Sequence, residues 1–164
     1  MVACHLSESP WPALPHKPLL LIPVGSTEQH GPHLPFNVDT MIAVAVASRV
    51  GDRLADVHGS KVVVAPAVEF GASGEHQDFP GTLSIGHEAL RVVLIELVRS
   101  ASSWAKEIVF VNGHGGNVST MTEVIITMRA EGHDVSWVPC ALETATDAHA
   151  GFDETSVALT LDPQ

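Results

Sequence analysis

Residues 19–54 read LLLIPVGSTEQHGPHLPFNVDTMIAVAVASRVGDRL, and the fold class follows from this segment. It begins with a short apolar run, Leu19–Gly25, which predicts a buried strand. It ends with a longer apolar stretch, Met41–Leu54, which is typical of a helix that Asp39 or Thr40 could cap. A strand and a helix in this order, joined by a polar loop, form the first half of a βαβ unit.

The same alternation continues along the chain. A β-branched run over Lys61–Val68 predicts a second strand, and apolar residues at helical spacing over Glu88–Trp104 predict a helix. A strand, a helix, a strand and a helix are then expected over Glu107–Val111, Ser119–Glu131, Asp134–Pro139 and Glu154–Leu161. This order predicts an α/β fold with a mostly parallel sheet and helices on both faces. No repeat or linker interrupts it, so we expect residues 1–164 to form a single domain.

Polar segments follow the predicted strands at four places: Ser26–Asp39, Phe70–Thr82, Asn112–Asn117 and Asp147–Glu154. In open α/β sheets, functional groups collect in the loops beyond the carboxyl ends of the strands. We therefore expect all four loops to open on the same edge of the sheet.

The composition argues against several classes of partner. The net charge is −11, and only eight of the 164 residues are Lys or Arg, with no basic run. Binding to nucleic acid or to an anionic membrane surface is therefore not expected. The N-terminal segment lacks the basic start of a signal peptide, and no apolar run approaches the roughly 18 residues of a membrane span. Two cysteines cannot build a disulfide framework, and we expect a cytoplasmic protein.

The first loop carries Glu28, His30 and Asp39, a set of side chains from which half of a metal site could be built. Glu28 and His30 are two residues apart, so their side chains point the same way in an extended segment. The alternative is that Asp39 caps the following helix and His30 lies in an ordinary polar turn. From this loop alone the two interpretations are evenly matched.

The third loop, Asn112-Gly-His-Gly-Gly-Asn117, places His114 in a glycine-rich turn between a strand and a helix. Such turns let the backbone approach a ligand or an ion closely. A phosphate cradle is the rival interpretation, but no Lys or Arg lies in or near this loop. A metal ligand therefore suits His114 better than a phosphate clamp does.

The fourth loop adds His149 and, five residues later, Glu154. Taken singly, Glu154 is an ordinary acid in the first turn of a helix and His149 a loop histidine. Three such loops on one sheet edge make these separate explanations improbable as a set.

Together these motifs resemble the creatininase family of metal-dependent amide hydrolases. The resemblance rests on Glu28-x-His30-Gly-Pro-His-Leu-Pro with Asp39, on Asn112-Gly-His-Gly-Gly-Asn117, and on His149-Ala-Gly-x-x-Glu154-Thr-Ser. It implies a three-layer α/β sandwich with a mostly parallel central sheet. Gly25–His30 and Ser73–Ile85 further resemble the branch associated with the mycofactocin system, whose members trim the C-terminus of a modified precursor peptide.

The resemblance also implies a binuclear centre and a homo-oligomer, usually a hexamer. By motif position, Glu28, Asp39 and His114 would hold one divalent ion. His30, the bridging Asp39 and Glu154 would hold the other. Creatininase has a glutamate where Gly116 stands here, so that ligand role passes to Glu154. Imidazole and carboxylate ligands suit zinc, iron(II) or manganese.

The catalytic role implied by the family falls on His149, as the histidine that moves protons while the two ions activate water. Ser73, Glu75 and His76 are candidates for substrate binding, although Gly74, Pro80 and Gly81 would also suit a merely structured turn. His33 is a candidate for an outer contact.

The expected activity is hydrolysis of an amide C–N bond, in a short peptide or a small amide. Removal of a C-terminal dipeptide from a precursor peptide is the preferred form. A creatininase-type cyclic amidohydrolase, a deformylase and an inactive member are the alternatives. Family members continue beyond the segment that ends in Ser156, whereas this sequence ends eight residues later, so we expect a C-terminally shortened form of the fold.

Overall fold

The fold is built around a five-stranded parallel sheet, described by a computed structural model for residues 2–58, 61–141, 147 and 149–163. The strand order is β1-β3-β2-β4-β5. The strands are β1 (Cys4–His5), β2 (Leu19–Val24), β3 (Val62–Val64), β4 (Glu107–Asn112) and β5 (Val135–Pro139). The α-helices are α1 (Val38–His58), α2 (Gly86–Ala101), α3 (Val118–Ala130) and α4 (Phe152–Leu161). Short 3₁₀ turns lie at Leu6–Glu8, Trp11–Ala13, Gly74–His76 and Gly115–Asn117.

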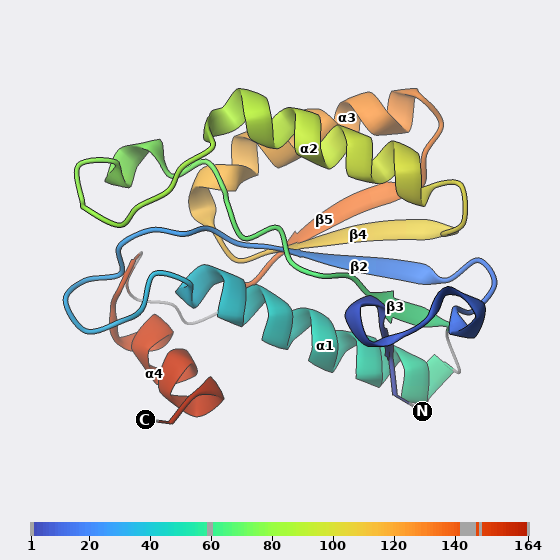
Figure 1. Cartoon of the computed structure of the whole chain (residues 1–164), viewed down its shortest axis with the longest axis horizontal. Coiled ribbons are helices and arrows are strands. Elements are labelled where there is room, and N and C mark those ends of the chain that lie inside the picture. The colour runs from blue at the N-terminus through green and yellow to red at the C-terminus, as the bar shows by residue number, and fades with distance from the viewer. Residues whose placement is uncertain (1, 59–60, 142–146, 148, 164) are drawn as a thin grey trace.

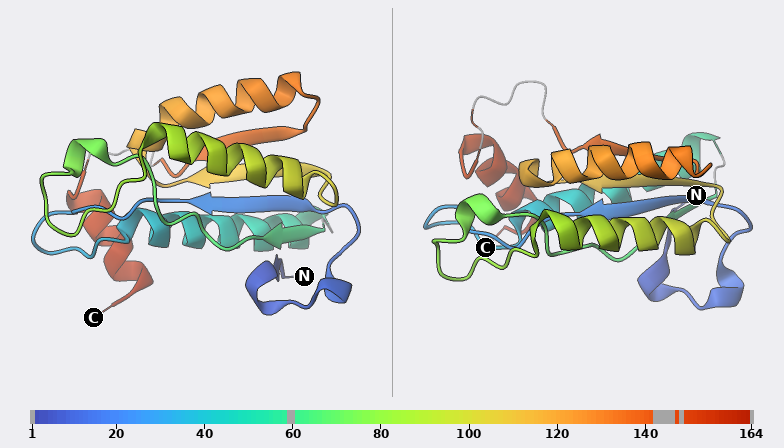
Figure 2. Two further views of the ribbon diagram at one scale, coloured as in Figure 1. Left: turned by 45° about the horizontal axis from the view of Figure 1, so that its top comes forward. Right: turned by 90° about the horizontal axis from the view of Figure 1, so that it is seen from above.

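The helices form two layers, one on each face of the sheet (Figures 1 and 2). Helices α2 and α3 cover one face, and α1 covers the other with α4 beside it. The three-layer α/β sandwich expected from the sequence is therefore confirmed.

The central strand β2 contributes to the core on both faces, because side chains alternate along a strand. Leu20, Ile22 and Val24 belong to the apolar cluster that includes α2 and α3. Leu21 belongs to a second cluster that includes Ala47 and Ala55 of α1. Burial of a large apolar side chain stabilises a fold by roughly 1.5–3 kcal/mol, so this alternation fixes the register of β2.

The direction of chain progression reverses beside β2. The chain runs from β2 through α1 to β3 on one side, then through α2 to β4 on the other side of β2. Strands β2 and β4 are paired from Leu19 opposite Glu107 to Val24 opposite Asn112. The loops that follow them therefore begin side by side, at the topological switch point where α/β sheets bind ligands.

Several predicted boundaries were wrong. The β-branched run at Lys61–Val68 forms strand only over Val62–Val64, and Val68 makes just an isolated bridge to Val24. The strand β1 was missed, since two residues are too few to show a period. Helix α1 begins at Val38, which places Asp39 within its first turn, and α4 begins at Phe152, before Glu154. Among the described residues, every helix is too short or too polar to span a lipid bilayer.

Candidate metal centre

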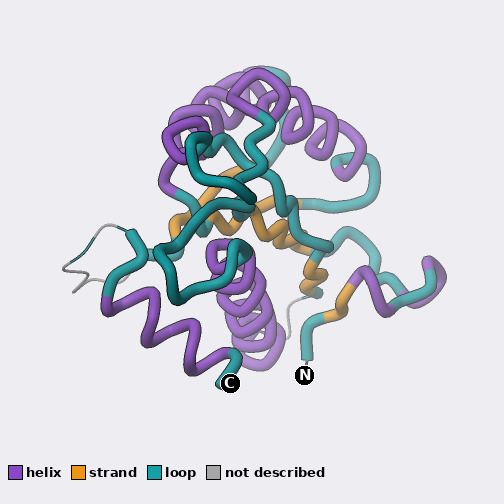
Figure 3. The backbone as a smooth tube through the Cα atoms, turned by 60° about the vertical axis from the view of Figure 1, so that its left-hand side comes forward, coloured by secondary structure: helices purple, strands orange, loops and turns teal. Residues whose placement is uncertain are grey.

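The candidate centre lies where the loops after β2 and β4 meet the start of α1, on the end of the sheet that faces the viewer in Figure 3. Two glycines permit this close approach. A Cβ at Gly25 would lie 2.5 Å from the Thr40 Cα, and a Cβ at Gly113 would lie 2.3 Å from the Asp39 backbone oxygen. Any side chain at either position would displace the first turn of α1.

Glu28, Asp39 and His114 form the first candidate metal position, and all three are buried. His114 Nδ1 lies 3.1 Å from Asp39 Oδ2 and 3.3 Å from Glu28 Oε1. These are the three residues that the family resemblance assigns to one ion, and they come together from three separate elements.

His30, His149 and Glu154 form the second candidate position. His30 is fully buried, while His149 and Glu154 are half-buried. The His30 and His149 ring centroids are 4.5 Å apart, and Glu154 Oε2 accepts a hydrogen bond from the Ala150 backbone N–H. His30 Nε2 also lies 3.1 Å from Asp39 Oδ1, so Asp39 faces both positions through its two oxygens. The structure thus brings together all five predicted ligands, with His149 next to them.

Backbone carbonyls orient the two buried histidines. His30 Nδ1 lies 3.2 Å from the Glu28 carbonyl oxygen, and His114 Nε2 lies 3.2 Å from the Ala72 carbonyl oxygen. In each ring the other nitrogen faces the carboxylates. Histidines that bind a metal are commonly held in this way, with one N–H donated to a carbonyl and the other nitrogen left for the ion.

The pKa values of these groups reflect their mutual attraction. Burial alone would raise the pKa of Asp39, but hydrogen bonds from His114 and His30 and the charge of His30 hold it well below its ordinary value. Burial would lower the pKa values of His30 and His114, yet the hydrogen bond and charge of Asp39 raise both overall, together with the charge of Glu28 in the case of His114. The site is therefore strongly attractive to positive charge.

Glu28 provides the test of whether a metal ion fits. Its side chain is 0% exposed, and neither carboxylate oxygen has a hydrogen-bond partner among the described residues. A buried carboxylate without a partner costs several kcal/mol, on the order of the penalty for a desolvated ion. A divalent cation held by Glu28, Asp39 and His114 would remove that penalty, so the residues present fit a metal ion.

Ser73, Glu75 and His76, the predicted substrate-binding residues, lie along one wall of the centre. Ser73 is fully buried, with Oγ 3.5 Å from His114 Nε2. Glu75 is 51% exposed, with Oε1 3.6 Å from the same nitrogen. His76 Nε2 lies 3.7 Å from Glu28 Oε1. Glu75 and His76 are accessible to a substrate, whereas Ser73 is buried and contacts the centre through His114.

Four residues that shape the site were missed by the sequence reasoning. Ser26 donates a hydrogen bond to Asp39 Oδ2 at 2.7 Å. The Asn117 side chain joins three loops, because it donates to the Gly25 carbonyl and to Asn112 Oδ1 and accepts from the Ala72 N–H. The Asn112 side chain in turn donates a hydrogen bond to the His114 carbonyl. Gln29 contacts both His76 and His149. The asparagines were visible as the ends of the glycine-rich motif, but nothing in the sequence marks the role of Gln29. Nε2 of His33, the residue predicted to make an outer contact, lies 3.0 Å from the Thr155 hydroxyl of α4.

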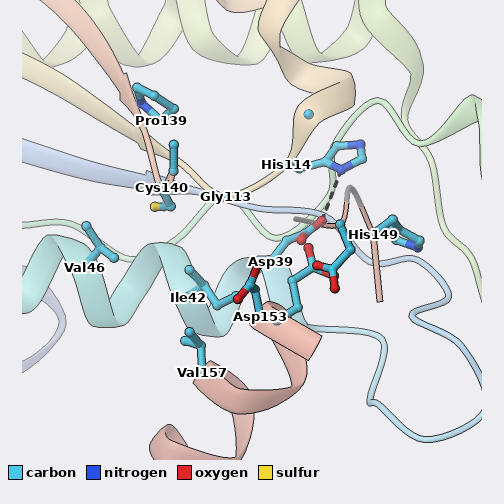
Figure 4. Close-up of a pocket in the computed structure, with 14 residues that line it drawn as sticks. Asp39, Ile42, Val46, Gly113, His114, Pro139, Cys140, His149, Asp153 and Val157 are labelled. Carbon is cyan, nitrogen blue, oxygen red and sulfur yellow. Dashed lines mark ion pairs between the residues drawn. The ribbon is translucent and has the colours of Figure 1, made fainter. Parts of the chain in front are cut away.

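A cavity of about 390 Å³ adjoins the centre (Figure 4). Asp39, His114 and His149 lie at one end, and Ile42, Val46 and Val157 form an apolar wall toward the other. Cys140 also lines the cavity, and burial raises the pKa of its thiol to about 11, so it is a neutral group at physiological pH. The cavity can therefore receive a partly apolar group next to the candidate ligands.

Comparison with known proteins gives a consistent family. The model of the family described as creatininase (creatinine amidohydrolase) matches residues 8–164. A protein of Mycolicibacterium smegmatis named mycofactocin precursor peptide peptidase is 56% identical over 146 residues, which cover 89% of this chain and 59% of that protein. The chain therefore spans less than two thirds of the length of this curated relative.

Solved structures show the same likeness. A tryptophan-to-alanine mutant of creatininase superposes with a TM-score of 0.80 at 26% identity, covering 98% of this chain and 74% of that one. A glutamate-to-glutamine mutant creatininase described as the Zn–Zn type superposes with a TM-score of 0.73 at 26% identity, over 99% of this chain and 74% of that one.

Proposed function

This chain belongs to the creatininase family, and from that premise we propose that it is a metal-dependent hydrolase of amide C–N bonds. Its preferred substrate in this proposal is a mycofactocin precursor peptide, from which it removes a C-terminal dipeptide. The observation that carries the proposal is the convergence of buried carboxylates and imidazoles beside one cavity, where neither Glu28 oxygen has a hydrogen-bond partner in the described part of the chain.

In this proposal the ligands divide between two divalent ions. Glu28, Asp39 and His114 hold one, and His30, Asp39 and Glu154 hold the other. When bound, such ions polarise a carbonyl and make a water molecule more acidic. The buried walls around Glu28 and Asp39 exclude bulk water, which strengthens every charge interaction in the site. His149, accessible at the cavity and beside Glu28, moves the proton to the leaving nitrogen.

A peptide substrate is favoured over creatinine by two observations. The relative from M. smegmatis is named a peptidase. In addition, Gly115 places no side-chain bulk beside His114, and a Cβ there would meet no heavy atom within 4 Å. The loop therefore leaves open space beside Gly115 that an extended peptide can occupy.

The wider properties in this proposal are those of the family. The ions are zinc, iron(II) or manganese, the chain forms one domain of a cytoplasmic homo-oligomer, and no nucleic acid or membrane is bound. The net charge of −11 supports the last two exclusions.

The test is to incubate metal-loaded protein separately with the precursor peptide and with creatinine. Mass spectrometry should show release of a C-terminal dipeptide, and elemental analysis should give two metal ions per chain. Turnover of creatinine with an untouched peptide would overturn the substrate, and absence of bound metal would overturn the reaction class.

A further inference from the structure

The sequence Glu28-Gln29-His30 places a glutamine between two candidate ligands. Its side chain contacts His76 and His149, which the proposed function does not use as ligands, although each belongs to a group that could hold a metal ion. We propose that Gln29 is a positioning residue that sets which ring nitrogens of His76 and His149 carry protons. As a result, His149 presents an unprotonated Nδ1 and His76 presents an Nε2–H to the same point beside Glu28. The catalytic consequence rests on the proposed hydrolase function, but the proton positions do not.

The orientation of the Gln29 amide is fixed by the backbone. The Gly31 N–H donates a hydrogen bond to Gln29 Oε1 at 2.9 Å. The amide nitrogen must then point the other way, and it lies 2.9 Å from His76 Nδ1. An amide nitrogen only donates, so His76 Nδ1 is the acceptor and the ring proton is on Nε2.

The proton position on the His149 ring is fixed by the main-chain carbonyl of Gln29. His149 Nε2 lies 2.9 Å from the Gln29 backbone oxygen, which only accepts, so Nε2 carries the proton. The Gln29 amide nitrogen also lies 3.1 Å from His149 Nε2, but an N–H cannot donate to a protonated nitrogen, so this contact is not a hydrogen bond. His149 Nδ1 is consequently the nitrogen with a free lone pair.

Stacking brings the two working nitrogens together. The His76 and His149 rings are 4.5 Å apart with an interplanar angle of 19°. His76 Nε2 and His149 Nδ1 lie 3.7 and 3.8 Å from the same Glu28 Oε1. One donor and one acceptor therefore face a single point next to the first metal position.

Amide hydrolysis needs such a pair. The oxygen of a water molecule forms a bond to the carbonyl carbon, and one water proton passes to His149 Nδ1. The C–N bond then breaks as His149 Nδ1 returns that proton to the leaving nitrogen, while His76 Nε2–H donates a hydrogen bond to the carbonyl oxygen. No other reactant is required, and both histidines end in their starting state.

The substitution that separates positioning from packing is Gln29→Glu. It keeps the side-chain shape and an acceptor for the Gly31 N–H, but a carboxylate oxygen replaces the donor that faces His76 Nδ1. The His76 proton should move to Nδ1. The matched control is Gln77→Glu, which adds the same charge at an exposed neighbour of His76.

The proton positions are measured by long-range ¹H–¹⁵N correlation of ¹⁵N-labelled histidine rings, with and without zinc. We expect Nε2–H on His76 and His149 in the parent chain, and Nδ1–H on His76 in Gln29→Glu. Metal content should stay unchanged, and kcat should fall about 10- to 100-fold, as for other residues that act through a neighbour. Gln77→Glu should match the parent chain.

Two results would overturn the inference. One is a proton on His149 Nδ1 in the parent chain, and the other is an unchanged His76 ring in Gln29→Glu. If the parent chain cleaves no amide while the ring protons lie as stated, only the proposed function fails. Loss of metal in Gln29→Glu would make Gln29 a support for the ligands instead.

Discussion

The two candidate metal positions share one edge of the sheet but are assembled differently. Glu28, Asp39 and His114 of the first position are all buried and come from the segments that follow β2 and β4 and from the first turn of α1. In the second position only His30 is buried, while His149 and Glu154 come from the chain around the start of α4 and are half-exposed. The first position is thus complete once the sheet and α1 have packed.

The second position depends in addition on how α4 is held. Helix α4 lies beside α1 (Figure 1), with Ala158 as its buried residue among those described. A direct side-chain link to the ligand loop is the hydrogen bond between His33 and Thr155. Elements with few buried apolar contacts open most easily, so the second position should be the weaker and more easily lost of the two.

The largest effect is expected where the two positions meet, at Asp39. Replacing it in Asp39→Ala removes the oxygens that face His114 and His30 at once. We expect metal content, measured by elemental analysis, to fall from two ions per chain toward none, with loss of amide hydrolysis. The control Asp56→Ala removes an exposed carboxylate from the same helix and should keep both ions. Full stoichiometry in Asp39→Ala would show that Asp39 is not shared.

The role of His149 separates two descriptions of the second position, because the geometry also permits His149 to bind the second ion. If it moves protons instead, His149→Ala should retain both ions and lose about 10²–10⁴-fold in kcat, the usual contribution of a general acid–base group. Elemental analysis and steady-state kinetics on one preparation separate the two roles. The exposed His16 supplies the matched control, His16→Ala, which should change neither quantity. A loss of one ion per chain in His149→Ala would make His149 a ligand.

The first candidate metal position could be predicted from the sequence to a greater extent than the contacts around the second. The apolar run of β2 and the polar segments behind β2 and β4 were visible, and with parallel pairing they place Glu28 and His114 together. The contacts of Gln29 were not predictable, because they join residues 47 and 120 positions apart in the chain. The strand β1 was missed, and the strand predicted over Lys61–Val68 was too long, because tertiary packing, not local pattern, decides where such short strands begin and end.

The first position should also show a conflict between stability and metal binding at Glu28. Because this buried carboxylate lacks a hydrogen-bond partner among the described residues, Glu28→Gln should stabilise the metal-free chain by about 1–3 kcal/mol in urea unfolding. In the presence of zinc the order should reverse, because the parent chain then gains binding energy that the variant has lost. The exposed Glu123→Gln on α3 is the control for removing a negative charge. A metal-free Glu28→Gln chain that is less stable than the parent would mean that the carboxylate is already compensated.

The smallest effect is expected at the attachment of α4. The Thr155 hydroxyl lies 2.6 Å from the Gly151 carbonyl and donates to it, so toward His33 Nε2, 3.0 Å away, it is the acceptor. Thr155→Val removes this link while keeping the side-chain shape, and a hydrogen bond of this kind contributes about 0.5–1.5 kcal/mol. If α4 docking supports only the second position, the second ion should bind about 2- to 10-fold more weakly in calorimetric titration, with the first ion unaffected. Thr160→Val is the matched control, since Thr160 bonds only within its own helix, to the Ser156 carbonyl, among the hydrogen bonds assigned to it. Equal weakening of both ions would show that the two positions are held as one unit, and the contrast between them would then be wrong.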